Sequence, residues 1–126
     1  MKNAIVFSLL ILFPLLFAAC AYDAVNADYA TQADCSQIDS TQNTYAASIK
    51  AILDANCATA GCHDVATQAS SIDLSTFSLA KEAFTNGEAL CSIHFGSGCI
   101  GMPKAGKLSD ELINKIDCWV KNGFLQ

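Results

Sequence analysis

The sequence contains no arginine, and seven lysines face twelve acidic residues, so the formal net charge is −5. Proteins that bind nucleic acid need a basic patch for the phosphates, and this charge balance argues against such a partner. No useful length of chain alternates apolar and polar residues, which argues against strands. No internal repeat is present either. These absences leave helices as the main expected element.

Long hydrophobic runs are also scarce, because only residues 4–19 form one, shortly after a lysine at position 2. A serine and a proline interrupt this run, and it falls short of the ~20 apolar residues that span a bilayer. It therefore predicts a signal peptide over residues 1–19. No second run of this length follows, so we expect a mature protein without a transmembrane helix.

The signal ends in Leu-Phe-Ala-Ala-Cys, which resembles the lipobox of bacterial lipoproteins and makes Cys20 a candidate lipid attachment site. The alternative is an ordinary signal peptide, cleaved after Ala19 or Ala21. Lipid on Cys20 would anchor the domain to a bacterial membrane. We expect an exported protein on the periplasmic or cell-surface side.

The remaining chain is long enough for one small domain. Residues 20–43 are small and polar and predict a flexible tether and lead-in, and residues 44–126 predict the folded domain. Helical spacing predicts a helix over residues 45–56, with Thr44 as its cap. A second helix is expected over residues 78–87.

Residues 91–107 are rich in glycine and predict a loop, after which a last helix begins at Ser109 and stops at Gly123. This helix carries one apolar stripe, formed by Leu112, Ile113, Ile116, Trp119 and Val120. Cys118 lies about 100° from the edge of that stripe, so it is placed to tether another segment. The expected fold class is all-α, with about three helices.

Cysteine is plentiful, and six residues remain if Cys20 carries lipid: Cys35, Cys57, Cys62, Cys91, Cys99 and Cys118. Unpaired thiols are unexpected in an oxidising compartment. The count fits three disulfides, or two disulfides plus a cofactor that holds two cysteines. A histidine directly after Cys62 favours the second count.

That histidine completes the pattern Cys57-x4-Cys62-His63, which extends the Cys-x-x-Cys-His signature of covalent c-type haem by two residues. In that chemistry two thiols form thioethers with the haem vinyl groups, and the adjacent imidazole coordinates the iron. The second cysteine and the histidine must be neighbours, whereas the gap between the cysteines is less restricted. Gly61 can adopt the positive φ that a longer loop requires.

A distal iron ligand is the next requirement, and Met102 is the only methionine beyond the signal peptide. It lies in a glycine-rich loop before Pro103, where a methionine that only fills the core is unusual. His94 is the alternative distal ligand, and it would lower the reduction potential. The simpler expectation is that His94 lies at the surface, or near the site without touching the iron.

Taken together, the order SIKAILDANCATAGCH, IDLSTF and GMPKAGKLSDELINKIDCWVKNGF resembles small bacterial monohaem c-type cytochrome domains, including lipoprotein versions. The resemblance covers residues 49–124. It implies one covalent haem c on Cys57 and Cys62, with His63 and Met102 as axial ligands. It also implies that Trp119 packs in the core near the haem. The implied activity is single-electron transfer between redox partner proteins by a monomer, with no catalytic residue of its own.

The other four cysteines allow three pairings, and we favour Cys35 with Cys118 and Cys91 with Cys99. Two other interpretations stay open. Cys57, Cys62 and His63 could supply three ligands of a structural zinc site, with Cys91 or Cys99 as the fourth, although an adjacent cysteine and histidine rarely reach one tetrahedral ion. Alternatively, Cys57 and Cys62 could pair in a disulfide-stapled binding lipoprotein without haem. Lys104 and Lys107 flank Met102 and could contact haem propionates or a partner, or only solvent.

Overall fold

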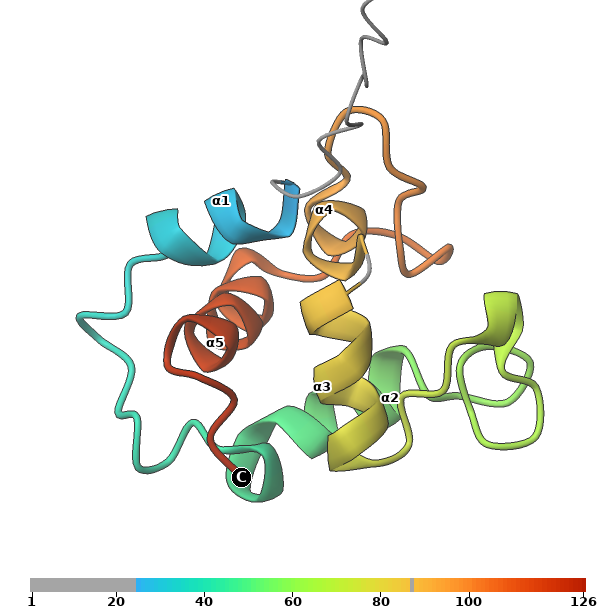
Figure 1. The fold of residues 1–126 in the computed structure, drawn as a ribbon, viewed down its shortest axis with the longest axis horizontal. Coiled ribbons are helices and arrows are strands. Elements are labelled where there is room, and N and C mark those ends of the chain that lie inside the picture. The colour runs from blue at the N-terminus through green and yellow to red at the C-terminus, as the bar shows by residue number, and fades with distance from the viewer. Residues whose placement is uncertain (1–24, 87) are drawn as a thin grey trace, which may run out of the picture.

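The structure, a computed structural model, describes residues 25–86 and 88–126, and within them it contains helices, turns and loops without a strand (Figure 1). The expected all-α class is confirmed for this part of the chain, which holds five α-helices where we expected about three. The predicted signal peptide and Cys20 lie outside the described residues. The elements are α1 (Val25–Gln32), the π-helical turn η1 (Tyr45–Ile49), α2 (Lys50–Asn56), the 3₁₀ turn η2 (Ala69–Ser71), α3 (Phe77–Asn86), α4 (Ala89–His94) and α5 (Asp110–Lys121).

Helix α5 is the central element, and its boundaries follow from the sequence. The Ser109 hydroxyl accepts a hydrogen bond from the Leu112 amide, which caps the helix as expected. Gly123 ends it with a φ of +81°, a value that glycine adopts without strain. The predicted stripe faces the core, where Ile116 and Trp119 are fully buried.

Trp119 organises the core through its contacts with other aromatic rings. The ring of Phe124 lies 4.9 Å away, centroid to centroid, and those of Phe84, Tyr45 and Phe77 lie 6.0, 6.1 and 6.4 Å away. The indole Nε1 donates a hydrogen bond of 2.8 Å to the Leu125 carbonyl, so its polar atom is satisfied. Edge-to-face packing of this kind adds to the gain from burial alone.

The segment from residue 45 to residue 56 is helical, as its spacing predicts. Thr44 caps it, because its hydroxyl accepts a 3.2 Å hydrogen bond from the Ala47 amide. The first turn is a π-helix, and only Lys50 onward is α-helical. Cys57 follows directly after the end of α2.

The tether expected through residue 43 is too long, because residues 25–32 form α1, which packs on α4 and α5 (Figure 1). Ala30 is 5% exposed in the core. The Lys121 ammonium donates hydrogen bonds of 3.2 and 2.8 Å to the carbonyls of Thr31 and Ala33. Tertiary contacts, rather than an apolar stripe of its own, hold this helix in place.

Two further differences from the expected elements concern the middle of the chain. Helix α3 begins at Phe77, one residue before the expected start, and the Thr76 hydroxyl accepts from the Leu79 amide. The expected stop at Gly87 lies outside the described residues. Helix α4 occupies residues 89–94, although we expected a loop from residue 91 onward. The segment is helical because Leu90, Cys91 and Ile93 are all buried in the core.

Both favoured disulfides are present. Cys35 is bonded to Cys118 with a sequence separation of 83, and Cys91 is bonded to Cys99 with a separation of 8. Cys118 is fully buried, because the segment after α1 covers that flank of α5.

We predict that replacing Cys35 and Cys118 together by serine lowers the free energy of unfolding by about 4 to 5 kcal/mol, because the bond closes a long loop in the unfolded chain. Replacing Cys91 and Cys99 is the matched control, and its shorter loop predicts a loss of about 2 to 3 kcal/mol. Urea denaturation of both double variants measures the difference. An equal loss in the two would contradict the loop-length account.

Candidate functional site

The Cys57-x4-Cys62-His63 motif lies where α2 ends and a long loop over residues 57–72 begins. The Cys57 amide donates a 2.8 Å hydrogen bond to the Leu53 carbonyl, so this residue continues the last turn of α2. Its side chain is at the edge of the core, with 9% of the residue exposed. Gly61 has a φ of +83° and turns the chain so that Cys62 is exposed to solvent.

His63 is fixed in orientation by its own loop. Its amide donates a 3.1 Å hydrogen bond to the Cys57 carbonyl, and its carbonyl accepts a 2.9 Å hydrogen bond from the Leu74 amide. The ring nitrogen Nδ1 lies 3.3 Å from the Ile72 carbonyl oxygen. A carbonyl only accepts, so Nδ1 is the donor in this contact, and Nε2 is the nitrogen left to coordinate in the neutral form of the ring. Histidines that bind metals usually have this arrangement, with one nitrogen tied to a carbonyl and the other free to coordinate.

Cys57 and Cys62 are both unpaired, although the other four cysteines among the described residues form disulfides. A Cys57–Cys62 disulfide, required by one alternative interpretation, is therefore absent. Burial, and secondarily the charge of Cys62, raises the pKa of the Cys57 thiol to about 11, so Cys57 is a neutral thiol at ordinary pH. Within the described residues no three His, Cys, Asp or Glu side chains are grouped closely enough to hold a metal ion. The structure therefore does not assemble a zinc site from Cys57, Cys62 and His63.

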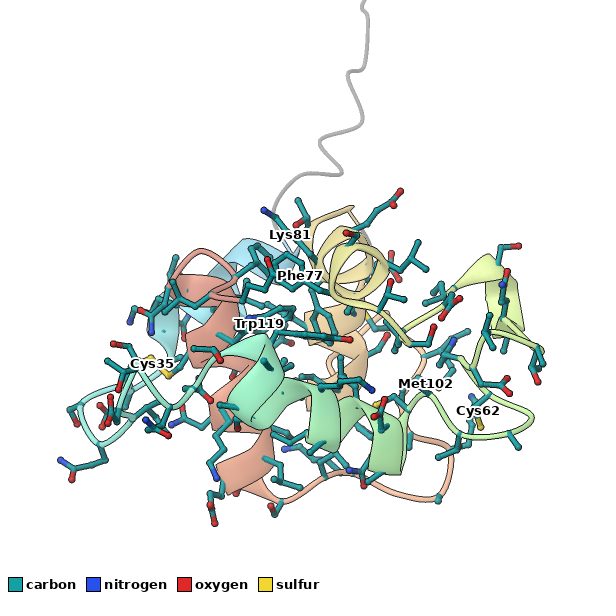
Figure 2. All side chains as sticks on the ribbon, turned by 90° about the horizontal axis from the view of Figure 1, so that it is seen from below. Cys35, Cys62, Phe77, Lys81, Met102 and Trp119 are labelled. Atoms are coloured by element: carbon teal, nitrogen blue, oxygen red, sulfur yellow. A yellow bond between two sulfur atoms is a disulfide. The ribbon has the colours of Figure 1, made fainter. Side chains whose placement is uncertain are left out.

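Met102 lies in the loop after α4, and its side chain is partly buried. Its amide donates a 3.0 Å hydrogen bond to the Ser92 carbonyl, which fastens the loop to α4. Cys62 and Met102 lie at the same end of the molecule, far from Cys35 (Figure 2). The fold thus brings the two expected ligand-bearing loops to one end.

His94 has a different environment from Met102. Its Nε2 donates to both carboxylate oxygens of Asp117, at 2.9 and 3.1 Å, and its ring stacks on Tyr29 with centroids 4.2 Å apart. Asp117 is 4% exposed, and our sequence analysis missed it. A signal existed, since Asp117 falls only about 40° beyond Ile113, at the edge of the α5 stripe, at 100° per residue.

Lys104 and Lys107 are exposed in the Met102 loop. The Lys107 ammonium lies 3.5 Å from a carboxylate oxygen of Asp110, and both side chains are open to solvent. An exposed pair of this kind contributes little to stability. Neither lysine is tied into the core, so both are placed for contacts with solvent or a partner.

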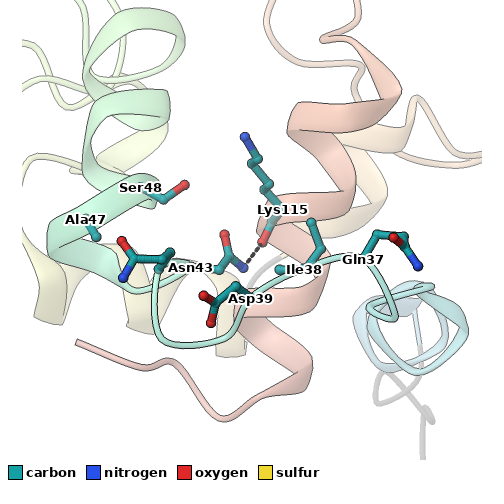
Figure 3. Close-up of a pocket in the computed structure, with 8 residues that line it drawn as sticks. Gln37, Ile38, Asp39, Asn43, Ala47, Ser48 and Lys115 are labelled. Atoms are coloured by element: carbon teal, nitrogen blue, oxygen red, sulfur yellow. Dashed lines mark hydrogen bonds between the residues drawn. The ribbon is translucent and has the colours of Figure 1, made fainter.

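A separate pocket of about 290 Å³ lies between the segment after Cys35, the first turn of η1 and α5 (Figure 3). Asn43 donates a 2.9 Å hydrogen bond from Nδ2 to the Lys115 carbonyl at this place. The pocket is lined by Gln37, Ile38, Asp39, Gln42, Asn43, Ala47, Ser48 and Lys115. None of the residues expected to bind haem contributes to it.

Among residues 25–86 and 88–126, no helix is both long and apolar enough to cross a bilayer. Comparison of the chain with protein-family models, curated proteins and solved structures gives no match in any of the three. The functional interpretation therefore depends on the geometry of the residues described above.

We predict that the cofactor-free protein loses stability as the pH rises from about 9 to about 11. The folded state retains the Cys57 proton up to a pKa of about 11, whereas the unfolded thiol releases it near 9.0. The free energy of unfolding should fall by about 2 to 3 kcal/mol over this range. Urea titrations at several pH values measure this free energy, and in Cys57→Ala it should depend less on pH over the same range. An unchanged slope in the variant would contradict the assignment.

Proposed function

We propose that this chain is an exported c-type cytochrome that carries single electrons between redox partner proteins. It would hold one haem covalently through Cys57 and Cys62, with His63 and Met102 as the axial ligands of the iron. A haem bound in this way supplies a one-electron couple between ferric and ferrous iron. The chain's own part is to hold these ligands and to limit the access of water.

The observation that carries this proposal is the state of the His63 ring beside two unpaired thiols. Its Nδ1 lies 3.3 Å from the Ile72 carbonyl oxygen, which supports Nε2 as the nitrogen that would coordinate the iron. Cys57 and Cys62 remain thiols in a structure that pairs the other four described cysteines. Two thiols, an imidazole and a thioether sulfur from Met102 are the donor set of a methionine-ligated haem c, and these residues fit that group in chemistry.

Met102 is favoured over His94 as the distal ligand by what each residue already contacts. The Nε2 of His94 is engaged by the buried Asp117 carboxylate, and its ring is stacked on Tyr29. No hydrogen bond or ring contact within the described part of the chain involves the Met102 side chain. For His94 to bind the iron, its hydrogen bond to the buried Asp117 carboxylate would have to break, whereas Met102 could bind the iron without losing a hydrogen bond of its side chain.

The proposed cellular role follows from the N-terminal sequence rather than from the described residues. A lipid on Cys20 would anchor the domain to a bacterial membrane, on the periplasmic or cell-surface side, close to membrane-bound electron donors or acceptors. The protein would have no substrate of its own, and one partner would reduce it while another oxidised it. An enzyme could also be the partner that receives or delivers the electron.

We predict that protein from a host with a haem-attachment system retains haem on a denaturing gel. Its spectrum should show a sharp reduced α-band and the weak far-red band of methionine-ligated ferric haem. Met102→Ala should lose the far-red band but keep covalent haem, and Cys57→Ser with Cys62→Ser should lose the covalent haem. His94→Leu is the control for the distal ligand and should keep the band. A colourless wild-type protein from that host would overturn the proposal.

We also predict that full-length protein in a bacterial host incorporates radiolabelled palmitate and that Cys20→Ser abolishes the label. The reason is that Cys20 supplies the only thiol at the expected cleavage site. Ala21→Ser is a neighbouring control and should keep the label. Export of an unlabelled wild-type protein would instead indicate an ordinary signal peptide.

A further inference from the structure

The loop that carries Met102 is attached to α4 and to the residue directly after it by three separate contacts. The Cys91–Cys99 disulfide joins the helix to the loop, and the Met102 amide donates 3.0 Å to the Ser92 carbonyl. The ring of Phe95 lies against Gly101, where an added Cβ would come within 2.6 Å of Phe95 Cδ1. The position of the Met102 loop therefore depends on the position of α4.

Helix α4 has only six residues, too few to be stable alone, so its position depends on its neighbours. One strong polar contact fixes its C-terminal end. His94, its last residue, donates from Nε2 to Asp117 of α5 at 2.9 and 3.1 Å. Tyr29 of α1 covers the other side of the imidazole by stacking at an interplanar angle of 18°.

The buried carboxylate makes this contact costly to break. Asp117 has a side chain that is 5% exposed, and burial raises its pKa while the facing His94 lowers it. Removing the donor to a buried carboxylate leaves that carboxylate without a hydrogen-bond partner, which is unfavourable. The pair therefore holds α4 in one position against α5.

We propose that His94 and Asp117 are positioning residues for Met102. Through α4, they would determine how firmly the Met102 loop is held at the end of the molecule where His63 lies. Neither residue would touch the cofactor. The inference builds on the proposed function, which assigns Met102 to the iron, but its mechanical part concerns the loop itself and can be tested without haem.

The test compares His94→Leu, which removes the donor, with His94→Gln, whose amide can still donate to Asp117. His94→Leu also prevents a released His94 from binding the iron. Ile116→Val, beside Asp117 in the core of α5, is the control for general loss of stability. Binding of imidazole to the ferric haem protein reports how readily Met102 leaves the iron. We expect His94→Leu to bind imidazole about fivefold more tightly than wild type, with His94→Gln and Ile116→Val close to wild type.

Hydrogen exchange of the Met102 amide, measured in haem-free protein, gives a second readout that does not depend on the cofactor. It should be faster in His94→Leu than in wild type and unchanged in Ile116→Val. Asp117→Asn should also speed exchange of the Met102 amide, and it replaces His94→Leu in the test if that variant does not fold. Equal imidazole affinity and equal Met102 exchange in all variants would overturn the proposal, as would shifts that follow global stability alone. If wild type binds no haem, the proposed function fails, and the exchange rates still decide this inference.

Discussion

The burial of α5 around Trp119 is the constraint on which the rest of this structure depends. Four aromatic rings surround the indole, and they come from η1, from α3 and from the C-terminal residues. The preceding residue, Cys118, is bonded to Cys35, and Asp117 is hydrogen-bonded to His94 of α4. This one helix therefore has apolar contacts, a disulfide and a buried hydrogen bond on different faces. So small a chain has few other residues with which to build a core.

The parts of the fold that the sequence predicted are those with local signals. The apolar stripe, Ser109 and Gly123 define α5 without reference to any other element. Thr44 and the spacing after it likewise predict the helical segment that leads to Cys57. The favoured pairing of the two disulfides, one of three possible, was suggested by the position of Cys118 outside the stripe and by the closeness of Cys91 to Cys99.

The parts that were missed are stabilised by contacts between segments distant in sequence. Helix α1 has a polar sequence, and the side chains of Lys121 and Asn114 bind carbonyls of its last turn and the residues just after it. Helix α4 is short, and its buried residues give no period that can be distinguished from a loop. At the site, the motif named Cys57, Cys62 and His63. The position of the Ile72 carbonyl, which orients His63, depends on the conformation of the whole loop, and the spacing of the motif residues does not predict that conformation.

The Cys35–Cys118 bond has a mechanical consequence. Cys57, Cys62, His63 and Met102 all lie in the chain between its two ends, which are 83 positions apart in sequence. Tension applied to the protein by pulling on its two termini would pass from Cys35 directly to Cys118 through the sulfur atoms. The intervening chain would carry none of this load. If the domain is pulled by its N-terminal end while another molecule holds its C-terminal end, the loops that carry His63 and Met102 would therefore not be stretched.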